Sequence, residues 1–204
     1  MVQIDDSLLV AKLCPPGSGC TYTWTLVSQF GSMISEVEEL FGTRNHNYTI
    51  LGVEFSGTIP HIWFPLDIRY PHQCKRIAIQ LGEPAMMDAN LARFQLAHET
   101  VHLLDPVEAA NASVLEEGLA TYYQLMYFRR IVPNCSTVDA KYNAARELAA
   151  KLMAESPKAI KKLRAQGQTI STLTAQQLRE ECMGLTNEEA TILARPFRDW
   201  SGNV

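Results

Sequence analysis

Two histidines and a glutamate form the pattern in this sequence that points to a chemical reaction. His98 and His102 stand four positions apart, and Glu99 follows the first histidine. On an α-helix, positions i and i+4 share one face, so the two imidazoles can bind the same metal ion. The glutamate is then placed to take a proton from a water that the metal activates. The H-E-x-x-H pattern therefore predicts a catalytic metal site with Glu99 as general base.

The alternative is that both histidines are ordinary core or surface residues and that a motif with two free positions occurs by chance. The chain contains only five histidines in 204 residues. Two of these stand at the spacing that a helical site requires, with a glutamate where a base is required. We therefore favour the metal site.

A third ligand is required, because catalytic zinc commonly has three protein ligands and keeps a fourth position for water. Asp105 lies three residues after His102 and would share a helix face with both histidines. However, Asp105 precedes Pro106, and a residue before proline is disfavoured in a helix. A role in ending the helix is the simpler explanation for Asp105.

Glu116 and Glu117 are the other acidic candidates, and both lie at the start of the next helical segment. Glu116 stands three residues after Ser113 and fits a capping box, S-x-x-E. On a helix, Glu116 points about 100° away from Glu117. The capping role accounts for Glu116, and the choice between Asp105 and Glu117 depends on the motif around Glu117.

Residues 115 to 122 read L-E-E-G-L-A-T-Y. Together with H-E-x-x-H, this segment resembles the gluzincin metallopeptidases, the group that includes thermolysin and the alanyl-type aminopeptidases. The resemblance covers about residues 88 to 128. It implies that Glu117, the glutamate before the glycine, binds Zn²⁺ together with His98 and His102. It also implies that the protein hydrolyses peptide bonds in a peptide or protein substrate.

The chain departs from this family pattern at three points. Fourteen residues separate His102 from Glu117, a shorter connection than that of thermolysin and the aminopeptidases. Thr121 stands where thermolysin-like enzymes have an aspartate, and it could support the ligands only weakly. The G-x-M-E-N strand of the aminopeptidases is absent. We therefore expect a divergent, compact member, an endopeptidase rather than an aminopeptidase.

Two helices must position these residues. Apolar residues at 91, 94, 97, 101 and 104 have helical spacing, and Asp88 is placed to cap the helix. The histidines lie at the border of this apolar stripe, where a partly buried cleft can form. Asn111 or Ser113 can cap the second helix, and a short connection would pair the two helices antiparallel.

The part of the chain before the metal helix contains the predicted strands. Residues 48–55, 59–64 and 76–81 are rich in β-branched and aromatic residues, with a turn at 56–58 between the first two. The amphipathic segment 32–41, followed by Gly42, predicts a helix. By resemblance to zincins, an edge strand flanks the cleft, formed by 77–80 or by 59–63, where Pro60 favours an edge.

After residue 135, the periodicity predicts helices over 137–155, 157–166, 174–184 and 186–195. The fold class that follows is α+β and zincin-like, with a small N-terminal β-sheet, an active-site helix and a mainly helical C-terminal part. We expect one domain over residues 1–204, with a strand-containing half at about 1–87 and a helical half at about 88–204.

Composition excludes several classes of function. A net charge of −4 and a pI of about 5.7 give no electrostatic reason to expect nucleic acid. No segment has the ~18 uninterrupted apolar residues of a membrane span. The acidic N-terminus lacks the features of a signal peptide, which favours a cytoplasmic protein. Cys14 and Cys20 could close a small disulfide loop, but in that compartment we expect reduced thiols.

Two other functions agree with the same motif: a catalytically inactive binding protein with a zincin fold, or a protein with structural zinc. An intact Glu99 favours the enzyme, because an inactive site does not require a base. The group that would stabilise the oxyanion stays open. The candidates are His61, His72, Tyr122, Tyr123 and Tyr142.

Overall fold

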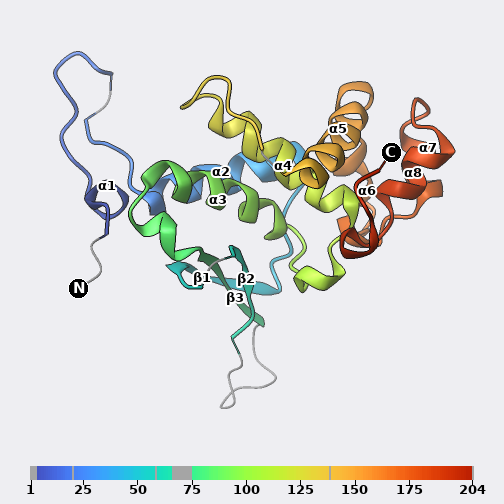
Figure 1. Cartoon of the computed structure of the whole chain (residues 1–204), viewed down its shortest axis with the longest axis horizontal. Helices are drawn as coiled ribbons and strands as arrows, with labels where there is room; N and C mark the ends of the chain where they lie inside the picture. Colours follow the sequence, from blue (N-terminus) through green and yellow to red (C-terminus); the bar gives the residue numbers. More distant parts are fainter. Residues whose placement is uncertain (1–3, 20, 58, 66–74, 138, 204) are drawn as a thin grey trace.

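The computed structural model describes residues 4–19, 21–57, 59–65, 75–137 and 139–203. Within this part, the chain forms eight α-helices and one three-stranded sheet, so the α+β class is confirmed. All three strands precede residue 82, and the named elements from Ala89 onward are helices (Figure 1). The predicted order of a strand-containing part and a helical part is therefore correct for the described residues.

The α-helices are α1 (Asp6–Leu9), α2 (Leu26–Phe41), α3 (Ala89–His102), α4 (Val114–Phe128), α5 (Ala140–Glu155), α6 (Ala159–Ala165), α7 (Ala175–Glu181) and α8 (Asn187–Leu193). The strands are β1 (Tyr48–Phe55), β2 (His61–Trp63) and β3 (Lys75–Leu81), and short 3-10 turns are η1 (Glu83–Met86), η2 (Ala109–Asn111), η3 (Ile170–Thr172) and η4 (Phe197–Asp199). Helix α2 begins well before the predicted residue 32, because the hydroxyl of Thr25 caps it.

The sheet has the order β1-β3-β2, with β1 parallel and β2 antiparallel to β3. The turn at 56–57 therefore does not join neighbouring strands, since β3 lies between β1 and β2. Residues Ile77 and Ile79 of β3 are fully buried, as expected for a central strand. Of the two segments that the sequence left open for the edge at the cleft, 77–80 therefore lies in the central strand, and β2, within 59–63, is an edge strand.

Helix α3 occupies the middle of the molecule. It packs on β2 and β3 on one side and contacts α2 and α4 on others (Figure 1). Ala92, Leu96 and Thr100 are buried, whereas Leu91 and Phe94 of the predicted stripe are only partly buried. The buried surface of α3 is therefore wider than an amphipathic stripe, because the helix has neighbours on several sides.

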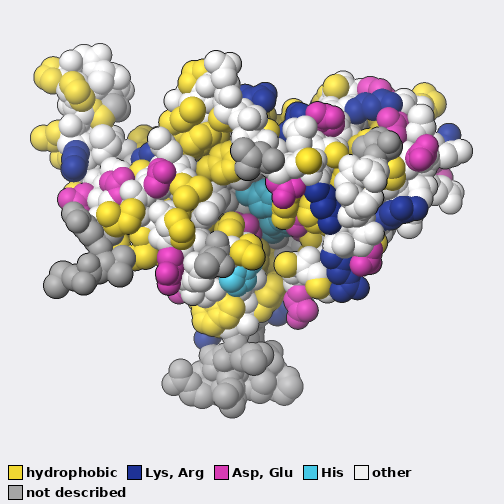
Figure 2. Space-filling model, in the orientation of Figure 1, with side chains coloured by type: hydrophobic (Ala, Val, Ile, Leu, Met, Phe, Trp, Pro, Cys, Tyr) yellow, Lys and Arg dark blue, Asp and Glu magenta, His cyan; other side chains and the backbone are white. Residues whose placement is uncertain are grey.

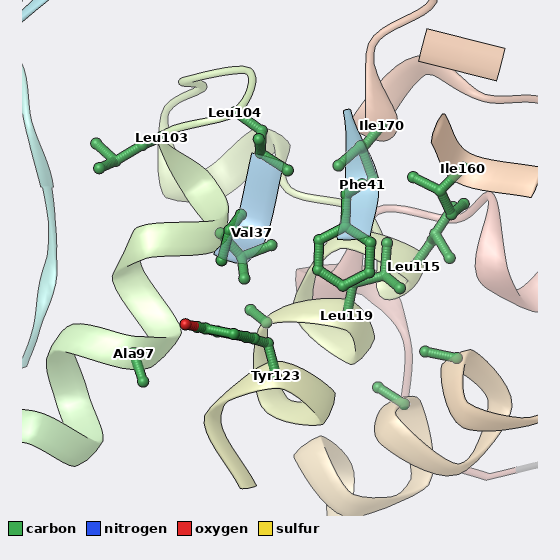
Figure 3. Close-up of a cluster of buried hydrophobic side chains, with 14 of the residues drawn as sticks. Val37, Phe41, Ala97, Leu103, Leu104, Leu115, Leu119, Tyr123, Ile160 and Ile170 are labelled. Carbon is green, nitrogen blue, oxygen red and sulfur yellow. The ribbon is translucent and has the colours of Figure 1, made fainter. Parts of the chain in front are cut away.

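A hydrophobic core joins α2 and α4 to the C-terminal helices. Phe41 from α2 packs with Leu115 and Leu119 from α4, and Ile160 and Ile170 close the same cluster (Figure 3). All five side chains are at most 1% exposed. This core holds the start of α4, where Glu117 lies.

Helices α4 and α5 approach closely at Gly118. A Cβ atom at this position would lie 2.4 Å from the carbonyl oxygen of Ala145 and 3.0 Å from Cβ of Ala149. Distances this short between nonbonded atoms require the backbone to move. Gly118 therefore sets the distance between the two helices, one residue after the proposed third ligand.

A buried arginine connects the ends of α2 and α3 to α6. Arg164 binds both carboxylate oxygens of Asp105, at 2.9 and 3.2 Å, and donates to the carbonyl oxygens of Phe41, Gly42 and Leu104. Such a two-pronged arginine–carboxylate pair fixes orientation as well as distance. The C-terminal end of α3 is held in place by these bonds.

Cysteine pairing differs from the prediction. Cys14 is disulfide-bonded, so the expectation of a reduced thiol at this position is wrong. It lies in a projecting segment where Leu13 and Tyr22 form an antiparallel bridge, and Cys20 lies outside the described residues. Among the described helices, none is long and apolar enough to cross a membrane.

The substitution Gly118→Ala should lower the free energy of unfolding by about 1–3 kcal/mol, because the added methyl group has no space between α4 and α5. Chemical denaturation measures this change. Gly31→Ala in α2 is the matched control, since nothing lies within 4 Å of a Cβ atom there. It should stabilise the protein by about 0.5–1 kcal/mol through helix propensity. Equal effects at both positions would contradict the role of Gly118.

Candidate metal centre

Two helices bring His98, His102 and Glu117 together. The Nε2 atom of His98 lies 3.1 Å from Oε2 of Glu117, and Nε2 of His102 lies 3.7 Å from the same oxygen. One ligand atom from each residue lies within 4.8 Å of the others. The three residues that the sequence predicted as ligands therefore meet at one point, and they could hold a metal ion.

The spacing of these atoms fits a small tetrahedral site. Ligand atoms bound at about 2.0–2.2 Å to one tetrahedral zinc ion are about 3.3–3.6 Å apart. The two distances to Glu117, 3.1 and 3.7 Å, lie close to this range. Two imidazole nitrogens and one carboxylate oxygen are also the donor types that zinc takes in catalytic sites.

The two rival ligands have other partners. Asp105 is held by Arg164 and accepts a hydrogen bond from the backbone N–H of Ile170, so it is a structural residue, as favoured from the sequence. The carboxylate of Glu116 does not cap the N-terminus of α4. The hydroxyl of Ser113 accepts a hydrogen bond from the Glu116 N–H. The Glu116 side chain bonds to His102 and Ser171 instead of to the backbone of Ser113, so the predicted capping box is only half formed.

The carboxylate of Glu116 instead supports His102. Nδ1 of His102 donates to Oε1 of Glu116 at 2.7 Å, and the hydroxyl of Ser171 donates to the other oxygen of Glu116. A carboxylate bound to the far nitrogen of a metal-ligating histidine fixes its tautomer and orientation. Sequence reasoning missed this role, although the doubled glutamate at 116 and 117 offered a signal for it.

Thr121 does not take part in the site. Its hydroxyl donates to the carbonyl oxygen of Glu117 at 2.9 Å, within its own helix. The supporting carboxylate that thermolysin-like enzymes place at this position is absent here. Glu116 instead bonds to His102, one of the three possible ligands, from a different position on α4.

Burial and the attraction between opposite charges shift the pKa values of the ionisable residues at this site. Burial raises the pKa of Glu99 and of Glu116. Burial also opposes ionisation of Glu117, but the positive charge of His102 and the hydrogen bond and charge of His98 together outweigh it and lower the pKa of Glu117. Burial lowers the pKa of His102, yet Glu117 and Glu116 outweigh this effect and raise it to about 10. Without metal, His102 is therefore protonated at neutral pH.

A cavity of about 180 Å³ lies beside the group, lined in part by Glu99, His61 and Tyr142. Histidine and acidic side chains meet in a hollow near the centre of this face of the molecule (Figure 2). His61 comes from the edge strand β2, and Tyr142 from the first turn of α5. Both were candidates for the group that would stabilise the oxyanion, and both line this cavity.

The two remaining candidates that the structure describes, Tyr122 and Tyr123, lie away from the cavity. Tyr123 is fully buried, and its hydroxyl reaches Glu36 and the carbonyl oxygen of Met33 on α2. Tyr122 packs against the core and does not line the cavity. His72 lies outside the described residues.

Tyr142 is oriented by its neighbours. Its ring meets the ring of His98 edge to face, with centroids 5.7 Å apart, and packs on Phe197 at 4.8 Å. Its hydroxyl has no hydrogen-bond partner among the described residues, and burial together with Glu117 raises its pKa. Tyr142 therefore offers a free, neutral donor at the wall of the cavity.

Comparison with protein-family models, with curated proteins and with solved structures finds no match to this chain.

The substitution Glu116→Gln should weaken metal binding about 10- to 100-fold, because an amide holds the His102 ring less firmly than a carboxylate does. Titration of the metal-free protein with Zn²⁺ against a competing chelator measures the affinity. Glu188→Gln on the exposed side of α8 is the control and should leave it unchanged. An unaltered affinity in Glu116→Gln would contradict the supporting role.

In the metal-free protein, the pKa of about 10 for His102 lies above the ordinary value of about 6.5. The stabilisation from this pairing is therefore complete below pH 6.5 and is lost as the pH rises through 10. The free energy of unfolding should fall on the order of a few kcal/mol between pH 7 and 10. Denaturation in the presence of a chelator tests this. His102→Gln should remove most of the fall, and an unchanged profile in this variant would contradict it.

Proposed function

We propose that this protein is a zinc-dependent metallopeptidase that hydrolyses peptide bonds, with a zincin-like fold and a site similar to that of the gluzincins. The observation that carries this proposal is the convergence of His98, His102 and Glu117 from two helices, beside Glu99, in one cavity.

The proposed metal is zinc, held by His98, His102 and Glu117. When bound there, zinc would lower the pKa of a coordinated water and polarise the scissile carbonyl. Structural zinc sites usually have four protein ligands. The described residues supply three, and a cavity lies beside them, which favours a catalytic site over a structural one.

Glu99 is the proposed general base. It lines the cavity, is 4% exposed, and burial raises its pKa. A carboxylate whose pKa moves towards neutrality transfers protons more effectively near pH 7. Glu99 would take a proton from the attacking water and give it to the nitrogen of the leaving amine.

Tyr142 is the proposed donor to the oxyanion that forms at the scissile carbonyl. A pre-oriented hydrogen-bond donor at such a position contributes to catalysis without reorganisation. The edge strand β2 supports the binding of an extended substrate, because among the described residues its backbone pairs with β3 on one side only. A peptide that runs along β2 would cross the cavity, as an endopeptidase requires.

The substitution Glu99→Gln should abolish hydrolysis and keep the metal, because it removes the base and leaves all three ligands in place. His98→Ala should lose both. Elemental analysis of the purified variants and cleavage of a broad peptide library measure the two properties. Wild type should contain about one zinc per chain.

Three outcomes separate this proposal from the alternatives. A protein without metal, with unchanged stability in chelator, would overturn it. Metal that survives Glu99→Gln, with no hydrolysis in wild type, would point to an inactive zincin-fold binding protein. A melting temperature that falls on chelation, again without hydrolysis, would point to structural zinc.

A further inference from the structure

The connection between α1 and α2 projects from the body of the protein (Figure 1). We call its residues 10–24, described apart from position 20, the arm. Across the arm, the backbone N–H of Cys14 donates to the carbonyl oxygen of Thr21 at 2.9 Å, and that of Thr23 donates to Lys12 at 2.7 Å. Cys14 is also disulfide-bonded. These bonds give the arm a defined shape before it meets any partner.

One face of the arm carries large apolar side chains. Leu13 and Tyr22 are opposite each other in an antiparallel bridge, and opposite residues of such a pair point to the same face. Trp24 shares this face, because side chains alternate along an extended chain and Trp24 lies two residues after Tyr22. The three side chains are 72%, 54% and 53% exposed. Three further exposed apolar residues lie at the base of the arm: Leu9, Val10 and Val27.

The charges around this face are unusual for the chain. Lys12, which is exposed, is the only charged residue from Ser7 to Ser35, whereas Asp and Glu make up 22 of the 204 residues of the whole sequence. Figure 2 shows apolar and uncharged side chains over the projecting segment, with the acidic side chains nearest to it at its base. The arm is therefore a weakly basic part of a protein whose net charge is −4.

Exposed apolar patches mark contacts with proteins or with membranes, and two observations favour a membrane. Trp and Tyr are the residues enriched where a bilayer meets water, because each has an apolar ring and a polar group. The stretch without acidic residues also extends well beyond the apolar face on both sides. A local protein contact does not require this, but attraction to a charged surface acts over about 10 Å and is weakened by every nearby carboxylate.

We propose that the arm binds the surface of membranes that contain anionic lipids. Leu13, Tyr22 and Trp24 enter the region between headgroups and acyl chains, and Lys12 lies among the headgroups. No described helix is long and apolar enough to cross a membrane, so the contact is peripheral and reversible. This inference goes beyond the proposed hydrolysis and does not depend on it, because the contact requires neither metal nor substrate.

Flotation with vesicles of phosphatidylcholine and phosphatidylserine tests the inference. Wild type should float with the vesicles, and the double variant Leu13→Ser/Trp24→Ser should lower the affinity at least about tenfold, because it removes two apolar side chains from the contact. Both positions are exposed, so the variant should fold normally, which circular dichroism checks.

The matched control is Ile131→Ser/Met183→Ser, which removes two exposed apolar side chains outside the arm. It should bind vesicles as wild type does. No binding by wild type, or an equal loss of affinity in the two double variants, would overturn the inference.

The role of Lys12 has its own variant. Lys12→Gln should lower the affinity for the mixed vesicles about fivefold, the effect of one basic residue near an anionic surface. Its affinity for vesicles of phosphatidylcholine alone should equal that of wild type. An unchanged affinity for the mixed vesicles would contradict the charge complementarity on which the choice of a lipid partner rests.

Sedimentation equilibrium without lipid distinguishes the other possible partners. A monomeric wild type that floats with vesicles supports the inference. A wild type that dimerises without binding vesicles, and that Leu13→Ser/Trp24→Ser makes monomeric, would show that a second copy covers the arm. A monomer that binds no vesicles would leave a different protein as the partner, and either of the last two results overturns the membrane contact. Repeating the flotation with metal-free protein keeps the result separate from any failure of the proposed hydrolysis.

Discussion

The structure depends on burying several ionisable groups in one place. Glu99, His102, Glu116 and Glu117 are each less than one-tenth exposed and lie together between α3 and α4. Buried charges are unfavourable unless each has a partner. His102 is the partner of both Glu116 and Glu117, because its ring lies between them. The hydroxyl of Ser171 completes the hydrogen bonds of Glu116. A metal ion would replace the proton of His102 as the positive charge that these carboxylates require.

The geometry of these side chains depends on contacts that other residues make around them. Arg164 and Asp105 fix the end of α3 from one side, with bonds that reach the end of α2 as well. Gly118 fixes α4 against α5 from the other side. Tyr142 is carried by the same helix α5, and Phe197 near the C-terminus supports its ring. The position of Tyr142 in the wall of the cavity thus depends on how the C-terminal helices pack.

Local signals allowed much of this to be predicted from the sequence. The cap at Asp88 and the motif spacing located α3 and its histidines correctly, since both depend on neighbours within one or two turns. Contacts between distant segments could not be predicted. The insertion of β3 beside β1 depends on non-local pairing, and the bond of Glu116 to His102 replaced a local capping bond. The disulfide at Cys14 likewise depends on a contact that spacing alone does not reveal.

Three consecutive residues of α4 face three different partners: Glu116 faces His102, Glu117 faces the metal position, and Gly118 faces α5. Successive residues on a helix are rotated by about 100°, so these directions are linked. One residue inserted between Ser113 and Glu116 would turn all three away from their partners at once. In the connection before Ser113, the residues 103–108 belong to no helix or strand, so their number does not set these directions. Length variation during evolution should therefore be tolerated in that connection and excluded from the first turn of α4.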